Sequence, residues 1–242
     1  MRDGLNWYGY CTNNPIMFVD PSGCTITIEG TRFENSISML ALQGLTDDTI
    51  DIDKNGNIYI ASKAEKITRN NGTFLVRSMI ASEHTASIRH INGSLRPDWF
   101  DNEPDLYSTA VAIPAGGYGE GSVMTKDGPN IGVDTEIYIN PNLYDAGGVD
   151  LPLYIQLGHE MIHAQRMMAG TVSPNANDYI PYGGNRYLAN YEEILTTGLQ
   201  PGIPGYQGIG LPGVQPNKWM FKYSMTENGL RAENGLPLRY IY

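Results

Sequence analysis

The residues best suited to chemistry are two histidines that flank a glutamate in the segment His159-Glu160-Met161-Ile162-His163. On a helix of about 100° per residue, His163 lies about 40° from His159, so both imidazoles share one face. Two imidazoles at this spacing can bind one Zn²⁺ at about 2.0–2.1 Å per nitrogen. Glu160, about 100° round the helix, reaches a water beside the metal without being a ligand. The motif predicts a zinc site with Glu160 as general base.

The chain has only four histidines, so two of them at this spacing around a glutamate are not expected by chance. A structural zinc is normally closed by four protein ligands, often cysteines. Neither Cys11 nor Cys24 lies near the motif, and we expect both to be free thiols. The sequence therefore predicts a catalytic zinc with three protein ligands and an open position.

The third ligand is not part of the motif itself. An extended metzincin pattern would need glycine at position 166 and histidine at position 169, and the chain has Arg166 and Ala169 there. His84 and His90 lie upstream in an expected strand, and we interpret them as ordinary strand residues. We therefore expect the third ligand among the acidic residues downstream of the motif.

The adjacent acids Glu192 and Glu193 are the favoured source of the third ligand. They follow the motif at a distance that lets a second helix return to the first, and adjacent side chains point in different directions. One can bind the metal while the other orients a histidine Nδ1–H, and we favour Glu193 slightly over Glu192 as the ligand. Asp178 stays open as an alternative, and Glu227 is explained as a complement to the dipole of a final helix.

These residues must be positioned by a small set of helices and strands. We expect the motif on a helix from about Leu153 to Ala169 that ends at Gly170, with an apolar stripe opposite the histidines. That helix should bury its stripe and present the histidines on its other face. The remaining expected elements are helices at 35–42 (capped by Asn35 and stopped by Gly44), 73–82, 191–197 and 226–233, and strands at 25–28, 50–53, 58–60, 84–91, 108–113 and 136–139.

This mixture predicts an α+β fold with a small mixed or antiparallel sheet. The histidine motif on its helix resembles that of zincin-like metallopeptidases, so we expect a domain of that class. The composition excludes several other classes. The 242 residues carry a net charge of −10, so no overall attraction to nucleic acid or to an anionic membrane is expected. No stretch of about 18 apolar residues is present, so we predict no membrane insertion. The first residues lack the apolar core of a signal peptide.

Residues 1–23 differ from the rest of the chain in their sequence pattern, with turn-forming residues between short aromatic runs. They contain the patterns Tyr8-Gly9-Tyr10, Asn13-Asn14-Pro15 and Asp20-Pro21-Ser22-Gly23. This segment closely resembles the end of the core of Rhs/YD-repeat proteins, where such a pattern closes a shell. The resemblance implies a junction segment at 1–23, followed at 24–242 by a toxin or effector domain that the repeat shell holds before release.

A second resemblance covers roughly residues 130–242. Its blocks are Ile137-Tyr138-Ile139-Asn140-Pro141, Leu157 to Ala164 around the histidine motif, Glu192 to Leu199, and Thr226 to Arg239. Together they resemble NleD-type effector metallopeptidases. The resemblance implies a secreted zinc endopeptidase delivered into the cytosol of a target cell, where the best-known branch cleaves mitogen-activated protein kinases. Residues 24 to about 110 match no block of that branch, so substrate choice stays open.

The predicted reaction is hydrolysis of a peptide bond in a target-cell protein, with Glu160 moving the proton of a zinc-activated water. Four residues are candidates for stabilising the oxyanion: Tyr179, Tyr182, Tyr223 and Arg231. One alternative is a non-enzymatic, zinc-stabilised binding or shell module, which would need a fourth protein ligand. Another is an antibacterial toxin restrained by a cognate immunity protein.

Overall fold

The computed structural model describes residues 26–90, 110–115, 120–141, 145–146, 149–174, 176, 178–182, 187–199 and 225–239. The predicted junction segment 1–23 lies outside these ranges. Among the residues described, no helix combines the length and apolar character needed to cross a bilayer. Helices and strands mix along the chain, which confirms the predicted α+β class.

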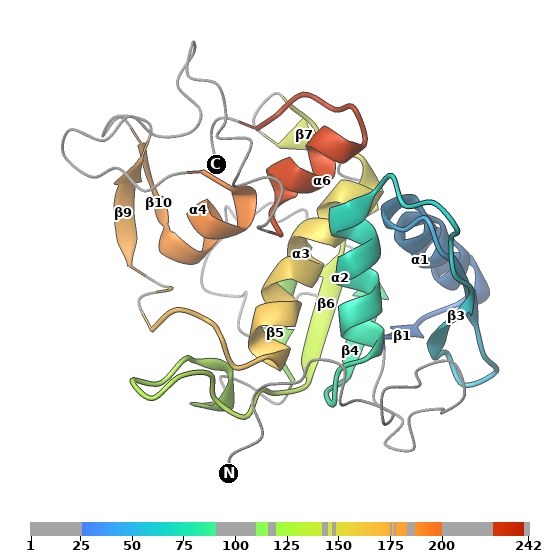
Figure 1. Cartoon of the computed structure of the whole chain (residues 1–242), viewed down its shortest axis with the longest axis horizontal. Coiled ribbons are helices and arrows are strands. Elements are labelled where there is room, and N and C mark those ends of the chain that lie inside the picture. The colour runs from blue at the N-terminus through green and yellow to red at the C-terminus, as the bar shows by residue number, and fades with distance from the viewer. Residues whose placement is uncertain are drawn as a thin grey trace.

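A four-stranded mixed sheet forms one layer of the fold (Figure 1). Its order is β1 (Ile26–Glu29), β4 (Ala86–His90), β6 (Thr135–Ile139) and β5 (Ala110–Pro114). The first three strands are parallel, and β5 pairs antiparallel with β6 at the end of this order. The strands predicted at these places are present, and the sheet is mixed rather than antiparallel.

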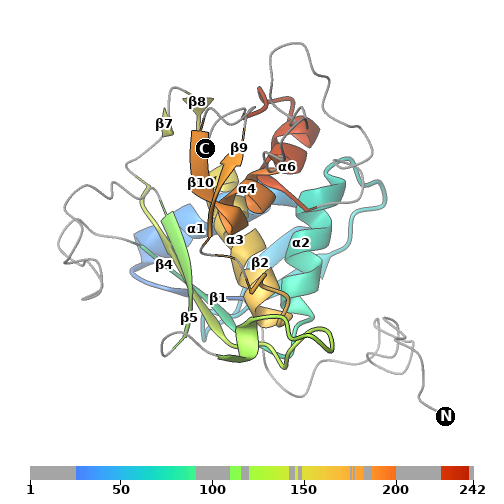
Figure 2. The same ribbon diagram turned by 90° about the vertical axis from the view of Figure 1, so that its left-hand side faces the viewer.

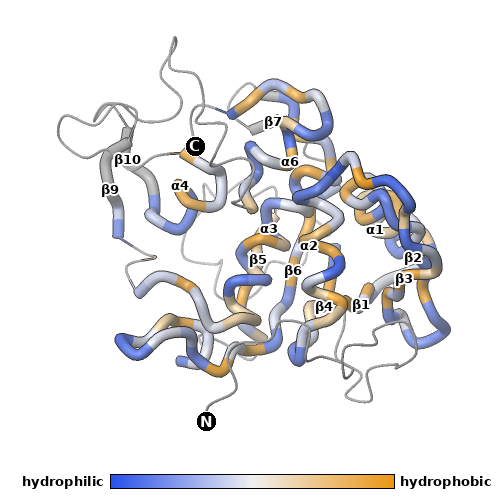
Figure 3. Tube along the Cα trace, viewed as in Figure 1, coloured by the Kyte–Doolittle hydropathy of each residue, from blue (hydrophilic) through white to orange (hydrophobic). Residues whose placement is uncertain are grey.

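Helices α1 (Arg32–Leu45), α2 (Asn70–Ile80) and α3 (Leu153–Met168) form the second layer. Figure 2 shows α3 between the strands β4 and β5 on one side and α2 on the other. Along β4, Ala86 and Ile88 are fully buried while Ser87 and Arg89 are partly exposed. This alternation places the helices on one face of the sheet and leaves a more polar opposite face. Hydrophobic and hydrophilic stretches also alternate along the helices (Figure 3).

The start and end of α1 differ from the prediction. Thr31, not Asn35, caps the helix, because the Thr31 side chain accepts from the Glu34 N–H and the Glu34 carboxylate accepts from the Thr31 N–H. This reciprocal capping box outweighs a single Asn cap. Gly44 is not a stop but lies inside the helix, where an added Cβ would come within 2.9 Å of Tyr154 on α3. The glycine therefore allows two helices to approach closely.

The remaining elements are short. A hairpin joins β2 and β3 as the Asn55-Gly56 pair predicts, and the described residues after it contain two further strand pairs and three short helical segments. Their bounds are β2 (Thr49–Ile52), β3 (Ile58–Ser62), η3 (Glu120–Ser122), β7 (Asp145–Ala146), β8 (Val149–Asp150), β9 (Tyr179–Tyr182), β10 (Tyr187–Asn190), α4 (Tyr191–Thr197) and α6 (Glu227–Glu233). Both α4 and α6 contact α3, at positions well separated from it in the sequence.

Helix α3 is the central element, and it is buried on more sides than predicted. Its apolar residues Leu157 and Met161 are buried, and so are His159 and His163, each with an exposed fraction of 6%. The two histidines lie together on the face opposite the apolar stripe, as predicted, and α4 and α6 contact α3 so that this face is buried as well. At Gly158, an added Cβ would come within 2.5 Å of Leu230 on α6, so the absence of a side chain permits this close packing.

Candidate metal centre

Three side-chain atoms converge beside α3. His159 Nε2 lies 3.1 Å from His163 Nε2, and the Oε2 atom of Glu193 lies 3.0 Å from the former and 3.3 Å from the latter. Helix α3 supplies both histidines at adjacent turns of one face, and the short helix α4 supplies the glutamate. These three residues form a group that could hold a metal ion.

The donor chemistry and spacing of this triangle fit a tetrahedral metal. Bonds of about 2.0–2.1 Å in a tetrahedron place neighbouring ligand atoms about 3.3 Å apart. The three measured separations of 3.0, 3.1 and 3.3 Å are close to such an edge length. Two imidazole nitrogens and a carboxylate oxygen are also a donor set that zinc accepts, with the fourth corner left for water or substrate.

Helix α4 presents Glu193 because both of its ends are fixed. The Asn190 side chain caps the start by accepting from the Glu192 N–H, and Gly198 ends the helix in the left-handed conformation with φ 83°. Within one turn, Glu193 faces the histidines while Glu192 reaches Arg166. The pKa of Glu193 lies well below its usual range: burial acts to raise it, but the charge of His163 and hydrogen bonds from both histidines lower it.

On the other side of His159, the Nδ1 atom lies 2.9 Å from Oε2 of Glu227. The Glu227 carboxylate is completely buried and also accepts from Arg231 (2.6 Å) and Arg239 (3.1 Å). Burial alone would raise the pKa of Glu227, but its bond to His159 and the two arginine charges lower it to about 2. Burial likewise acts to lower the pKa of His159, yet Glu193 and Glu227 raise it to about 10.

The Nδ1 atom of His163 has a different environment. Thr196 Oγ1 lies 3.4 Å from it and Glu192 Oε1 lies 3.8 Å from it. The same Glu192 oxygen pairs with Arg166, whose Nη1 also donates to Thr196 at 2.9 Å. The Nδ1 atom of His163 thus faces a hydroxyl and a carboxylate that are both shared with an arginine.

Glu160 lies on the sheet side of α3, separate from the three converging atoms. It is buried, with an exposed fraction of 8%. Burial raises its pKa, while the charges of His159 and His163 and a backbone hydrogen bond from Ala112 on β5 act to lower it. A carboxyl whose pKa is raised toward neutrality is suited to accept a proton and return it.

Other residues considered from the sequence lie elsewhere. Asp178, the alternative third ligand, has an exposed side chain. His84 Nε2 lies 2.9 Å from the carbonyl oxygen of Ile131, and His90 Nε2 lies 2.9 Å from Ser38 Oγ. None of these three belongs to the group that could hold a metal.

Of the four oxyanion candidates, the structure describes the side chains of Arg231 and Tyr179. Arg231 is completely buried, and its Nη1 donates to the carbonyl oxygens of Asp150 and Pro237, so it does not face a substrate. Tyr179 is 74% exposed. The side chains of Tyr182 and Tyr223 lie outside the described part of the chain.

Sequence reasoning missed the contact between Glu227 and His159. The dipole explanation accounts for an acid in the first turn of α6, but not for a carboxylate with an exposed fraction of zero. The available signal was the arginine one helical turn later, Arg231, because a Glu–Arg pair at this spacing can be buried as a unit. Residue spacing could not predict that the other carboxylate oxygen of Glu227 would contact His159.

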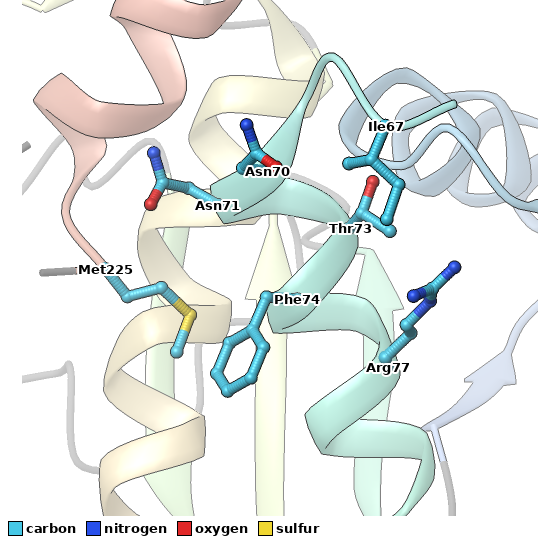
Figure 4. Close-up of a pocket in the computed structure, with 7 residues that line it drawn as sticks. All are labelled: Ile67, Asn70, Asn71, Thr73, Phe74, Arg77 and Met225. Carbon is cyan, nitrogen blue, oxygen red and sulfur yellow. The ribbon is translucent and has the colours of Figure 1, made fainter. Parts of the chain in front are cut away.

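A separate cavity of about 400 Å³ lies along α2 (Figure 4). Phe74 and Met225 point toward each other across it, and Arg77 lies at its opposite side. Its lining includes none of the metal-group residues or Glu160. The cavity is therefore distinct from the metal centre.

Comparisons with known proteins support the assignment of the chain to a family. A family model described as an effector protein, Peptidase M91, matches residues 44–242 and so includes α3, α4 and α6. No curated protein matches the chain. The family match confirms the resemblance to NleD-type effectors predicted over roughly residues 130–242 and extends it upstream to residue 44. The chain belongs to the Peptidase M91 family of effector proteins.

Proposed function

We propose that the chain is a zinc-dependent endopeptidase that cleaves a protein inside a target cell. The observation that carries the proposal is the triangle of His159 Nε2, His163 Nε2 and Glu193 Oε2, with Glu160 on the same helix. A peptidase family match over residues 44–242 supports hydrolysis as the chemistry. We assign His159, His163 and Glu193 as zinc ligands, Glu160 as general base, and Glu192 as a partner on the Nδ1 side of His163.

The mechanism divides the work among these residues. A bound zinc ion would polarise the scissile carbonyl and lower the pKa of an attacking water. Glu160 accepts the proton from that water and then donates it to the leaving amine, which its raised pKa favours. The buried histidines keep their Nε2 atoms 3.1 Å apart, so little rearrangement is needed on metal binding.

The effector family supports a host-cell protein as substrate and delivery into that cell's cytosol. A protein kinase is the substrate class that the resemblance to NleD-type enzymes favours. We further propose that residues 1–23 belong to an Rhs/YD-repeat shell that holds the domain before release. A cognate immunity protein is the partner expected if the target cell is bacterial.

The proposal is tested by pairing metal analysis with cleavage of a broad peptide library. The purified full chain should contain one zinc per molecule and cleave internal peptide bonds, with activity lost on chelation and restored by Zn²⁺. Bound zinc without cleavage of any peptide or protein, together with a fourth protein ligand in the coordination sphere, would support the non-enzymatic module instead.

A further inference from the structure

The side-chain network behind His159 has no role in the chemistry proposed above. We infer that Glu227, anchored by Arg231 and Arg239, is a positioning residue that sets the orientation and tautomer of His159. This inference rests on the proposed metal site and adds a requirement to it: helix α6 and residues 236–239 take part in metal binding without contacting the metal.

One buried carboxylate, that of Glu227, connects two arginines to His159. Glu227 Oε1 accepts from Arg231 Nε at 2.6 Å, and Oε2 accepts from Arg239 Nη1 at 3.1 Å and lies 2.9 Å from His159 Nδ1. A carboxylate flanked by two guanidinium groups stays ionised and can only accept hydrogen bonds. His159 Nδ1 must therefore carry the proton. A metal at His159 then uses Nε2, the atom that faces Glu193 and His163.

The two arginines that hold Glu227 are themselves held by further hydrogen bonds. Arg231 is completely buried and donates to the carbonyl oxygens of Asp150 (3.0 Å) and Pro237 (3.3 Å). The backbone of Arg239 is fixed on both sides by Asn228, whose side chain accepts from the Arg239 N–H at 2.7 Å and donates to its carbonyl at 2.9 Å. Arg231 is thus held by two backbone carbonyls and Arg239 by the Asn228 side chain, which limits the rotation of the Glu227 carboxylate.

The same helix provides a control acid nearly two turns away. Glu233 of α6 is partly buried, and its two oxygens accept from the backbone N–H groups of Asn71 and Gly72 at 2.7 Å each. It ties α6 to the start of α2 and touches no histidine in any of these contacts. Replacing Glu233 therefore tests whether loosening α6 is enough to disturb the metal centre.

The experiment compares Glu227→Gln with Glu233→Gln in the full chain. Zinc affinity is measured by competition with a chromogenic chelator, and the visible absorption bands of the Co²⁺-loaded protein report the geometry around the metal. Glu227→Gln should bind zinc about 10–100-fold more weakly and shift the Co²⁺ bands. Glu233→Gln should lower the melting temperature while its zinc affinity stays within about twofold of wild type.

Several outcomes would overturn the inference. Wild-type zinc affinity and unchanged Co²⁺ bands in Glu227→Gln would show that the network is only structural, and equal losses in both variants would assign the effect to helix loosening. If Glu227→Gln does not fold, Arg239→Gln replaces it, because it keeps the carboxylate and removes one anchor. It should weaken zinc binding by less than Glu227→Gln is expected to, and unchanged affinity and bands would then overturn the inference.

Failure of the proposed function would look different. A wild-type chain that binds no zinc contradicts the metal site itself. A wild-type chain that binds zinc through the two histidines but hydrolyses nothing contradicts the peptidase assignment and leaves the role of Glu227 intact.

Discussion

The two histidines of α3 lie one turn apart, yet the groups that hold their Nδ1 atoms differ in nearly every respect. His159 faces Glu227, a carboxylate with no exposed surface and two arginine partners. His163 faces a hydroxyl at 3.4 Å and, at 3.8 Å, an oxygen of Glu192 that is already paired with Arg166. One side is a closed ionic network and the other is a looser arrangement of shared partners.

The difference shows how burial changes the role of an acid. A buried carboxylate is costly unless opposite charges and hydrogen bonds compensate it, so Glu227 needs Arg231 and Arg239. Glu192, on α4, is compensated by a single arginine. Precise orientation on the α6 side therefore depends on a network assembled from segments about 70 positions apart, whereas the network on the α4 side joins one short helix to Arg166 near the end of α3.

The largest effect is expected for Glu160, which belongs to neither of the two networks that hold the histidine Nδ1 atoms. Glu160→Gln keeps size and hydrogen bonding but removes the proton acceptor, so turnover should fall by roughly 10²–10⁴. Zinc content and the melting temperature should stay at wild-type values. Steady-state kinetics and metal analysis of the same preparation check both statements, and an active Glu160→Gln would contradict the hydrolytic mechanism.

Separate substitutions of Glu193 and Glu192, the adjacent acids of α4, distinguish the proposed zinc ligand from the residue beside it. Glu193→Ala should lower zinc affinity by more than the roughly 10–100-fold typical of outer partners, and activity should fall in step. Glu192→Ala should stay within that range, because its oxygen lies 3.8 Å from His163 Nδ1. Competition with a chelator measures the loss of zinc affinity in Glu193→Ala, Glu192→Ala and Asp178→Ala and ranks the three variants. Zinc loss only in Asp178→Ala would move the third ligand to that residue.

The closed network should also contribute more to the stability of the metal-free chain than the looser one. Glu227→Gln leaves the charge of Arg231 without its buried partner, which should cost about 3–5 kcal/mol in the free energy of unfolding. Glu192→Gln should cost less, because Glu192 is not fully buried and Arg166 is partly exposed. Urea unfolding of the two metal-free variants measures these free energies. Equal losses would contradict the difference in stability between the Glu227 and Glu192 networks.

The pH dependence of that stability follows from the two shifted groups. The pKa of Glu227 falls from 4.5 to about 2 on folding, so its contribution is complete above pH 4.5 and is lost as the pH falls through 2. The pKa of His159 rises from 6.5 to about 10, so its contribution is complete below pH 6.5 and is lost as the pH rises through 10. The advantage of wild type over Glu227→Gln should be greatest between pH 4.5 and 6.5. A constant difference from pH 3 to 9 would contradict the pairing.

The smallest effect is expected at the hydroxyl. Thr196→Val keeps the shape of a completely buried side chain and removes the oxygen that lies 3.4 Å from His163 Nδ1. Because this contact is long and Glu192 remains nearby, zinc affinity should fall by less than about tenfold. Titration with Zn²⁺ against the same chelator measures the zinc affinity of Thr196→Val. A loss as large as that of Glu227→Gln would show that the partners of the two Nδ1 atoms are equally important for metal binding.

What the sequence could predict depended on how local each signal was. The spacing of His159 and His163 placed both imidazoles together, and Asn55-Gly56 placed a hairpin, because both signals act within a few residues. The start of α1 was wrong because a Thr31–Glu34 capping box was overlooked in favour of Asn35. A local signal was present there, and its interpretation was incomplete.

The contact of Glu227 with His159 could not be predicted in the same way. It depends on how α6 packs on α3, and no periodicity or spacing records that packing. The burial of the histidine face has the same origin, because the polar side of α3 looks solvent-facing until α4 and α6 cover it. The sequence could predict the types of these elements, but it could not predict how they pack over long range.

The close contact at Gly158 has a consequence for how much of the chain the candidate metal centre needs. Leu230 packs where a side chain at position 158 would lie, so the centre of α3 is completed by a segment more than 70 positions later. A chain shortened before α6 would keep both histidines of α3 but would lack Leu230 against Gly158 and Glu227 against His159. The surroundings of the candidate metal centre therefore need nearly the whole length of the domain, from α3 to the last helix.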